Sequence, residues 1–248
     1  MRSPAFALLF SAACGSGAVP ILVYHSVAEN GDALTVKPAL LEEHLDYLQR
    51  AGFTTVGLQQ VIDHEDGRGS LPTHPIVLTF DDGYEDAYSV ALPLLKARGM
   101  KATFFLISGF LASDAQQRHR ESGNSYLLWQ EALALLEAGM EMGSHTVRHR
   151  RVTELAVHDR RFELEQSKKD LESGLGQPVH FFAYPFTVQH FRARHAVRTA
   201  GYRAAVAGPH GGGDRYQLQR TTVHRYTTAG DLRDLLGESW ATAFTGGG

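Results

Sequence analysis

Two adjacent carboxylates, Asp81 and Asp82, stand at the end of an apolar run in the middle of the sequence. The run, residues 76–80, has the length and the β-branched and aromatic content of a buried strand, and Gly83 predicts a tight turn into a helix. In parallel α/β proteins, ligands bind at the carboxyl ends of the strands. An aspartate there can also cap the following helix, but one cap would account for only one of the two carboxylates.

A pair of histidines is the second signal. The segment GSHTVRH, residues 143–149, places His145 and His149 four residues apart after a predicted strand, which puts them on one face of a helical turn. With Asp82 they make a set of two imidazoles and one carboxylate, and three protein ligands leave positions open as in a catalytic zinc site. In a chain with 13 histidines this spacing alone would more often lie on the surface. The Asp-Asp strand end favours the metal site.

The two aspartates are expected to have different roles. A carboxylate bound to a metal is poorly placed to collect a proton, whereas its neighbour can hold the attacking water and act as general base. We therefore assign Asp82 to the metal and Asp81 to the base. Successive side chains of a strand point to opposite faces, so both can serve one site only if the backbone turns between them, and Gly83 supports such a turn.

Strands and helices alternate around these residues. The first strand is expected to end in Tyr24-His25-Ser26, and residues 108–126 are expected to form a long polar loop over one face. Further strands are predicted at residues 53–56, 101–107, 140–143, 179–183, 202–207 and 218–224, and helices at residues 39–51, 58–66, 84–98, 129–138, 153–173, 190–200 and 229–236. The alternation predicts a single α/β domain over residues 19–245, built as a distorted or incomplete (β/α) barrel.

The composition limits the class of partner. The 24 Lys and Arg against 27 Asp and Glu give a net charge of −3 without any basic run, which argues against nucleic acid. Cys14 is the only cysteine and excludes an internal disulfide. Residues 1–18 resemble a secretory leader with Cys14 at a lipoprotein-type cleavage site, the alternative being an unstructured apolar leader. We expect an extracytoplasmic monomer whose only membrane contact is a lipid on Cys14.

Three segments, in this order, resemble a known family. TFDDG, SHTVRH and FAYPF are similar to the first three motifs of the polysaccharide deacetylases, the NodB-homology carbohydrate esterases, and the resemblance runs from about Pro20 over nearly all of the chain. The stretches YHSV, TFDDGYEDAY, ALPLLKARGMKATFF and AGMEMGSHT are similar to the branch that includes the poly-N-acetylglucosamine deacetylases of bacterial biofilms.

The resemblance implies a NodB-type barrel and assigns the same roles that the residues had indicated. Asp81 would be the base, and the ligands of a divalent metal would be Asp82, His145 and His149. Zinc is the expected ion for such a set, with cobalt, nickel or iron as alternatives.

Amide hydrolysis also needs a general acid, because an amine leaves badly unless it is protonated. In the branch that this chain resembles, the acid is the histidine of the YH strand, which corresponds to His25. Elsewhere in the family it lies near the C-terminus, where His224 is the candidate. We favour His25 because it ends an apolar strand, as the Asp pair does.

The third motif departs from the family pattern at two positions. Ala183 stands where many members carry an arginine that orients the base, and Thr187 where glycine is frequent. The backbone N–H of Phe186 is our candidate for binding the oxyanion together with the metal. What orients Asp81 is left open.

Three further residues are candidates for binding the substrate. Pro185 would rigidify the turn of the third motif, and the rings of Tyr184 and Trp129, like that of Phe186, would stack on sugars. The expected function is metal-dependent removal of N-acetyl groups from a polysaccharide that contains N-acetylglucosamine, with poly-N-acetylglucosamine favoured. Chitin, peptidoglycan and acetylxylan are alternative substrates, and a member that binds polysaccharide without cleaving it is an alternative of another class.

Overall fold

A parallel sheet lies at the centre of the computed structural model, which describes residues 18–237. The strands pair in the order β10-β1-β3-β4-β7-β8-β9, and β2 pairs with β3. Their bounds are Ile21–Tyr24 (β1), Thr54–Thr55 (β2), Pro75–Phe80 (β3), Thr103–Leu106 (β4), Glu141–Ser144 (β7), Phe181–Ala183 (β8), Ala204–Val206 (β9) and Thr221–Thr222 (β10). All of these pairs are parallel, as alternating strands and helices require.

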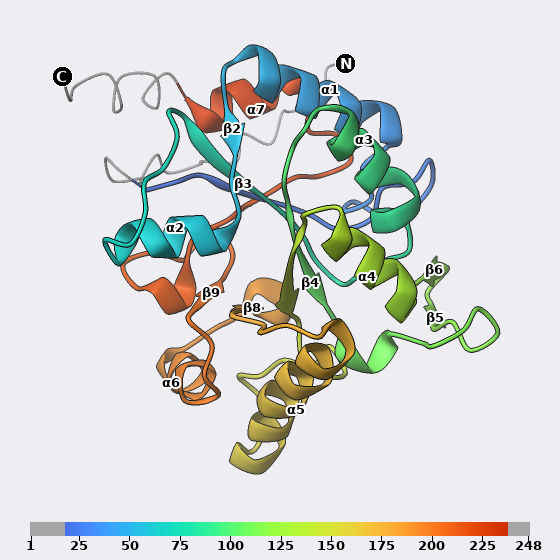
Figure 1. Cartoon of the computed structure of the whole chain (residues 1–248), viewed down its shortest axis with the longest axis vertical. Helices are drawn as coiled ribbons and strands as arrows, with labels where there is room; N and C mark the ends of the chain where they lie inside the picture. The colour runs from blue at the N-terminus through green and yellow to red at the C-terminus, as the bar shows by residue number, and fades with distance from the viewer. Residues whose placement is uncertain (1–17, 238–248) are drawn as a thin grey trace, which may run out of the picture.

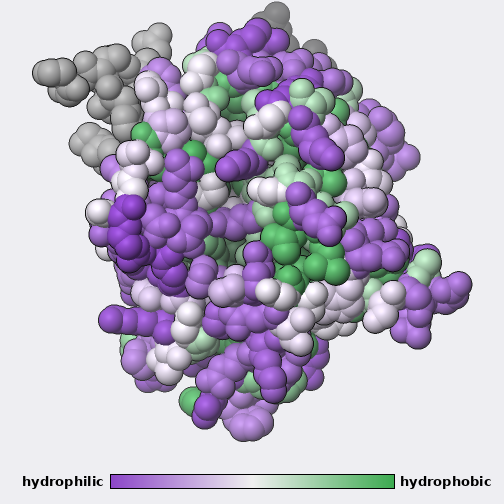
Figure 2. Space-filling model, viewed as in Figure 1, coloured by the Kyte–Doolittle hydropathy of each residue, from purple (hydrophilic) through white to green (hydrophobic). Residues whose placement is uncertain are grey.

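The helices lie around the outside of this sheet (Figure 1). They are Pro38–Arg50 (α1), Leu58–Glu65 (α2), Leu92–Ala97 (α3), Trp129–Glu137 (α4), Val157–Leu175 (α5), Phe191–Thr199 (α6) and Ala229–Leu236 (α7). Most of the face in view is hydrophilic, with hydrophobic residues gathered near its centre (Figure 2). Among the described residues, no helix combines the length and the apolar character needed to cross a membrane.

The two edges of the curled sheet are joined by one short segment, residues 218–222. Leu218 forms a parallel bridge with Val206 at the β9 edge, and three residues later β10 pairs with β1 at the other edge. The predicted strand at residues 218–224 is therefore shorter than expected, because its two ends pair with different edges. This connection closes the sheet into a distorted barrel and confirms the predicted fold class.

Two other elements differ from the prediction. The helix expected at residues 84–98 starts as a π-helix, Ala87–Ala91, and continues as α3. The expected loop at residues 108–126 contains a 3-10 turn, Ser108–Phe110, and a two-stranded hairpin of Arg120–Glu121 (β5) and Asn124–Ser125 (β6). Cys14 and all but the last residue of the expected leader lie outside the described residues.

Candidate active site

The residues singled out by sequence follow three strands of the barrel, β1, β3 and β7. His25 comes directly after β1, Asp81 and Asp82 after β3, and His145 after β7. Because these strands are parallel, their carboxyl ends meet at one end of the barrel, where α/β proteins hold their ligands.

The backbone turns at Asp82 itself. This residue has a φ of 73°, in the left-handed region, and Gly83 follows with a φ of 74°. A side chain on Gly83 would also approach the Leu106 side chain at 3.1 Å. The turn that allows both carboxylates to serve one site thus begins one residue earlier than the sequence indicated.

Asp82 meets both histidines of the second motif. Its Oδ1 lies 3.3 Å from Nε2 of His145 and 3.3 Å from Nε2 of His149. The three residues each offer one ligand atom, and these atoms all lie within 4.8 Å of one another. Ligand atoms around a tetrahedral ion with bonds of about 2.0–2.1 Å lie about 3.3 Å apart. Nδ1 of His145 is 2.9 Å from the carbonyl oxygen of Ala183, and donating its proton there leaves Nε2 free for a metal. The donor set therefore fits a divalent ion.

The electrostatics of His149 suit the same purpose, whereas, despite burial, the neighbouring aspartates raise the pKa of His145. Burial, together with the charge of His145, lowers the pKa of His149 to about 4. His149 is then neutral near pH 7, the form in which imidazole binds a metal.

The histidines converge from a loop and not from a helical turn, so that detail of the prediction is wrong. Thr146 has a φ of 71° and His149 a φ of 54°. Glu163 of α5 holds this loop: its fully buried carboxylate accepts hydrogen bonds from the N–H groups of Val147 and Arg148, both at 2.9 Å. The convergence is thus imposed by tertiary contacts.

Strained backbone is concentrated at this end of the barrel. Seven non-glycine residues in the described part of the chain have positive φ, and five of them lie two to five residues after the end of β3, β7 or β8. These five are Asp82, Thr146, His149, Phe186 and Thr187. Such conformations each cost about 1–3 kcal/mol and tend to occur at functional sites.

A fully buried arginine, Arg220, holds Asp81. Its Nη1 and Nη2 each donate to one carboxylate oxygen of Asp81 at 2.7 Å, and its Nε donates to the carbonyl oxygen of Ala207 at 2.9 Å. Burial raises the pKa of Asp81, but the Arg220 charge and neighbouring histidines outweigh burial, so the pKa is lowered and the carboxylate stays ionised.

Sequence reasoning missed Arg220. Arg220 makes the contact with the base that was expected of an arginine at position 183, but it comes from the segment that joins the two edges of the barrel. A charged residue between Leu218 and Val223, inside a predicted barrel strand, is the signal that could have revealed it.

The two candidate acids differ in their surroundings. Tyr24 pairs with Phe80 in the sheet, so His25 and Asp81 follow neighbouring strands at the same level. Burial lowers the pKa of His25, and the charges of Asp81 and Asp82 counteract that effect. The charge of His25 is in turn among the causes that lower the pKa of both aspartates. The ring of His224 instead stacks on Tyr226, with 5.3 Å between the centroids.

A family model described as polysaccharide deacetylase matches residues 68–205, more than half of the chain. The chain belongs to the polysaccharide deacetylases. This match confirms the family that the three motifs indicated.

Relatives and solved structures agree with this family. The Bacillus subtilis (strain 168) protein YxkH, assigned to the polysaccharide deacetylases, is 29% identical over 212 residues, which cover 83% of this chain and 71% of YxkH. The poly-beta-1,6-N-acetyl-D-glucosamine N-deacetylase of Escherichia coli (strain K12) is 25% identical over 46% of this chain and 18% of that protein. IcaB from Ammonifex degensii superposes with a TM-score of 0.74 at 25% identity, covering 91% of this chain and 96% of IcaB. The Streptococcus pyogenes deacetylase PplD shares the fold, with a TM-score of 0.76 at 23% identity over 86% of this chain and 96% of PplD.

The third motif of this polysaccharide deacetylase contains two buried rings, Phe182 and Tyr184, and one exposed ring, Phe186. Tyr184 is fully buried and its hydroxyl donates to the carbonyl oxygen of Tyr216 at 2.9 Å, so the prediction that it stacks on a sugar is wrong. Phe186 is 47% exposed and its ring centroid lies 4.7 Å from that of His149. The guanidinium of Arg151 lies 4.2 Å from the Phe186 ring centroid. Phe186 therefore has a ring face beside a candidate metal ligand.

The roles of Pro185 and Trp129 in binding the substrate stay predictions. Pro185 is buried in the turn of the third motif. The ring of Trp129 packs against Gly174 of α5, where an added Cβ would come within 2.2 Å of it.

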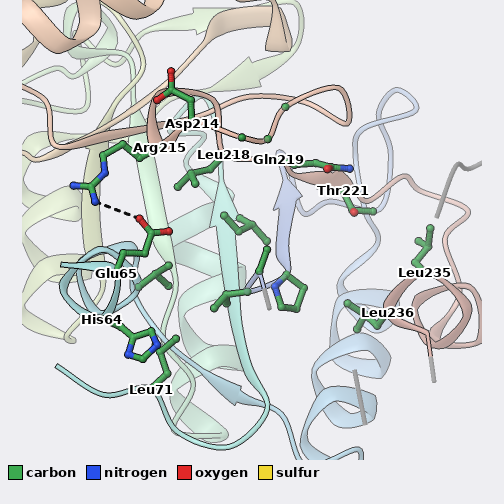
Figure 3. Close-up of a pocket in the computed structure, with 18 residues that line it drawn as sticks. His64, Glu65, Leu71, Asp214, Arg215, Leu218, Gln219, Thr221, Leu235 and Leu236 are labelled. Atoms are coloured by element: carbon green, nitrogen blue, oxygen red, sulfur yellow. Dashed lines mark ion pairs between the residues drawn. The ribbon is translucent and has the colours of Figure 1, made fainter. Parts of the chain in front are cut away.

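A cavity of about 720 Å³ lies elsewhere in the deacetylase (Figure 3). It is lined at the start of β1 by Pro20 and Ile21, and Glu65 pairs across it with Arg215 at 3.5 Å. None of the strand-end residues described above lines it. The candidate active site therefore lies outside this cavity.

Proposed function

We propose that this polysaccharide deacetylase depends on a divalent metal and removes N-acetyl groups from a polymer of N-acetylglucosamine, releasing acetate. The observation that carries the proposal is the meeting of Asp82, His145 and His149 beside the Asp81–Arg220 pair. Zinc is the ion that this donor set favours, and cobalt, nickel and iron also accept such ligands.

The residues of the candidate site have separate parts in the proposed reaction. A divalent ion bound there would polarise the acetamide carbonyl and compensate the charge that develops on its oxygen. Asp81, kept ionised by Arg220, takes a proton from the attacking water. We assign the N–H of Phe186 as a donor to the oxyanion, and His25 as the acid that protonates the nitrogen as the carbon–nitrogen bond breaks. The proximity of His25 to both carboxylates supports it over His224.

The substrate proposal rests on similarity. The name of the Escherichia coli relative specifies poly-beta-1,6-N-acetyl-D-glucosamine, and we extend that substrate to this chain. Chitin, peptidoglycan and acetylxylan remain alternatives, because the residues described above act on the acetyl group. Such polymers lie outside the cytoplasm, so we place the protein there, with Cys14 as the proposed lipid attachment site.

Acetate release tests the proposal. Metal-loaded protein is incubated with poly-N-acetylglucosamine, chitin oligomers, peptidoglycan and acetylxylan, and acetate is measured. We expect release from the first polymer and a loss of at least about 100-fold in the Asp81→Asn variant. Protein that binds glycan and metal but releases no acetate from any polymer would instead be a binding member of the family.

Metal content tests the ligands. The His145→Ala and His149→Ala variants are expected to retain little metal after dialysis. Undiminished metal in both variants would refute the ligand set.

A further inference from the structure

Asp86 ties the turn after β3 to the loop after β1. It is partly buried, and its Oδ2 accepts a hydrogen bond from the Ser26 hydroxyl at 2.6 Å. This contact joins residues 60 positions apart in the sequence.

Hydrogen bonds hold the chain on both sides of His25. On its N-terminal side, the carbonyl oxygen of Tyr24 accepts the N–H of Asp81 at 3.0 Å. On its C-terminal side, the Ser26 hydroxyl donates to Asp86 and the Ser26 carbonyl oxygen accepts the N–H of Val36 at 2.9 Å. The backbone of His25 is thus fixed at both ends to the segment that carries Asp81 and Asp82.

No hydrogen bond holds the Nδ1 side of the His25 ring. Nδ1 of His25 is buried and has no hydrogen-bond partner among residues 18–237. An imidazole that transfers a proton is usually oriented through its other nitrogen. Here the orientation depends on where the backbone places the residue, and Asp86 is the side chain that holds the C-terminal side of that backbone.

We infer that Asp86 positions His25 for proton transfer to the departing amine, acting through Ser26. The inference rests on the acid role of His25 in the proposed function. Loss of the Asp86 carboxylate would release the Ser26 side chain and shift the backbone beside His25, and with it the His25 ring, while Asp81, Asp82 and the two metal-site histidines keep their own contacts.

The test compares two leaving groups. An amine leaves only when protonated, whereas 4-nitrophenolate leaves without a proton, so an acid matters for the amide and little for the aryl ester. In the metal-loaded Asp86→Ala variant we expect kcat for acetate release from poly-N-acetylglucosamine to fall by at least about tenfold, since a general acid contributes about 100- to 10,000-fold. The KM is expected to stay unchanged, and 4-nitrophenyl acetate hydrolysis to change by less than about twofold.

Glu141 provides the matched control. Its Oε2 accepts the Thr103 hydroxyl at 2.6 Å and the N–H of Leu58 at 2.8 Å, so it too is a partly buried carboxylate that joins two elements. It lies at the first residue of β7, away from the carboxyl end of that strand. The Glu141→Ala variant is expected to lose stability and to keep the wild-type ratio of amide to ester hydrolysis.

Imidazole NMR gives a readout that does not depend on turnover. The His25 ring signals are expected to shift in Asp86→Ala, while those of His145 and His149 stay in place. Equal losses on amide and ester, an unchanged amide rate, or unshifted His25 signals would overturn the inference. Failure of the proposed function would look different, because wild-type protein itself would then release no acetate from the polymer.

Discussion

At the scale of single residues, the candidate site is a set of charges that compensate one another. The motifs were sufficient to predict Asp81, Asp82, His145 and His149, because these residues are close together in the sequence within each motif. Arg220 could not be predicted in the same way. Its contact with Asp81 spans 139 residues and depends on how the barrel closes.

Replacing Arg220 with methionine tests this compensation. The Arg220→Met variant leaves the Asp81 carboxylate buried and unpaired, which is expected to lower the free energy of unfolding by about 3–5 kcal/mol. We also expect a loss of at least about 100-fold in acetate release, because Asp81 is the proposed base. Urea denaturation and an acetate assay measure the two effects.

A second substitution separates charge from packing. Adding Asp81→Asn to Arg220→Met removes the unpaired charge and should recover much of the stability without recovering activity. If the Arg220→Met variant alone were as stable as the wild type, this would contradict the account of the Asp81–Arg220 pair.

The Asp86 carboxyl predicts a pH dependence of stability. Burial raises its pKa to about 6 from an ordinary value of 3.8, so the folded protein binds more protons than the unfolded chain between these pH values. Stability is therefore expected to fall as pH rises from about 4 to 6, by up to about 3 kcal/mol relative to Asp86→Asn. Denaturation of both proteins across this range, in the same metal state, measures the difference. A constant difference, or one of opposite slope, would disagree with this account.

At the scale of elements, the connection from β7 to α5 shapes the pair of histidines. The spacing of His145 and His149 indicated a helical turn, yet the loop adopts left-handed backbone at Thr146 and His149. Local sequence could not reveal this, because Glu163 holds the loop from the next helix. The motif predicted which residues meet, and tertiary contacts decide how they meet.

Removal of the Glu163 carboxylate should weaken metal binding although none of the proposed metal ligands is changed. In Glu163→Ala the N–H groups of Val147 and Arg148 lose their acceptor, and metal affinity is expected to fall about 10- to 100-fold, as for other residues that support ligands. Competition with a chelator measures the affinity. Glu165→Ala is the control, since Glu165 lies on the same helix in an exposed pair with Arg161. Equal affinities in the two variants would contradict the role of Glu163.

At the scale of the whole molecule, the barrel brings the ends of β1, β3 and β7 to one place. The alternation of strands and helices was enough to predict a parallel (β/α) barrel. Its closure was not predictable, because residues 218–222 read as one strand while their ends pair with opposite edges of the sheet. That closure also delivers Arg220 to Asp81, so fold and proposed chemistry depend on the same segment.

The dependence of acetate release on bound metal tests the central claim most directly. Metal-free protein is titrated with zinc, and acetate release from poly-N-acetylglucosamine is measured beside the metal content. The account predicts no release without metal, a rise that saturates at one ion per chain, and no activity in Asp82→Ala at any zinc concentration. Full release from metal-free protein, or an active Asp82→Ala variant, would contradict it.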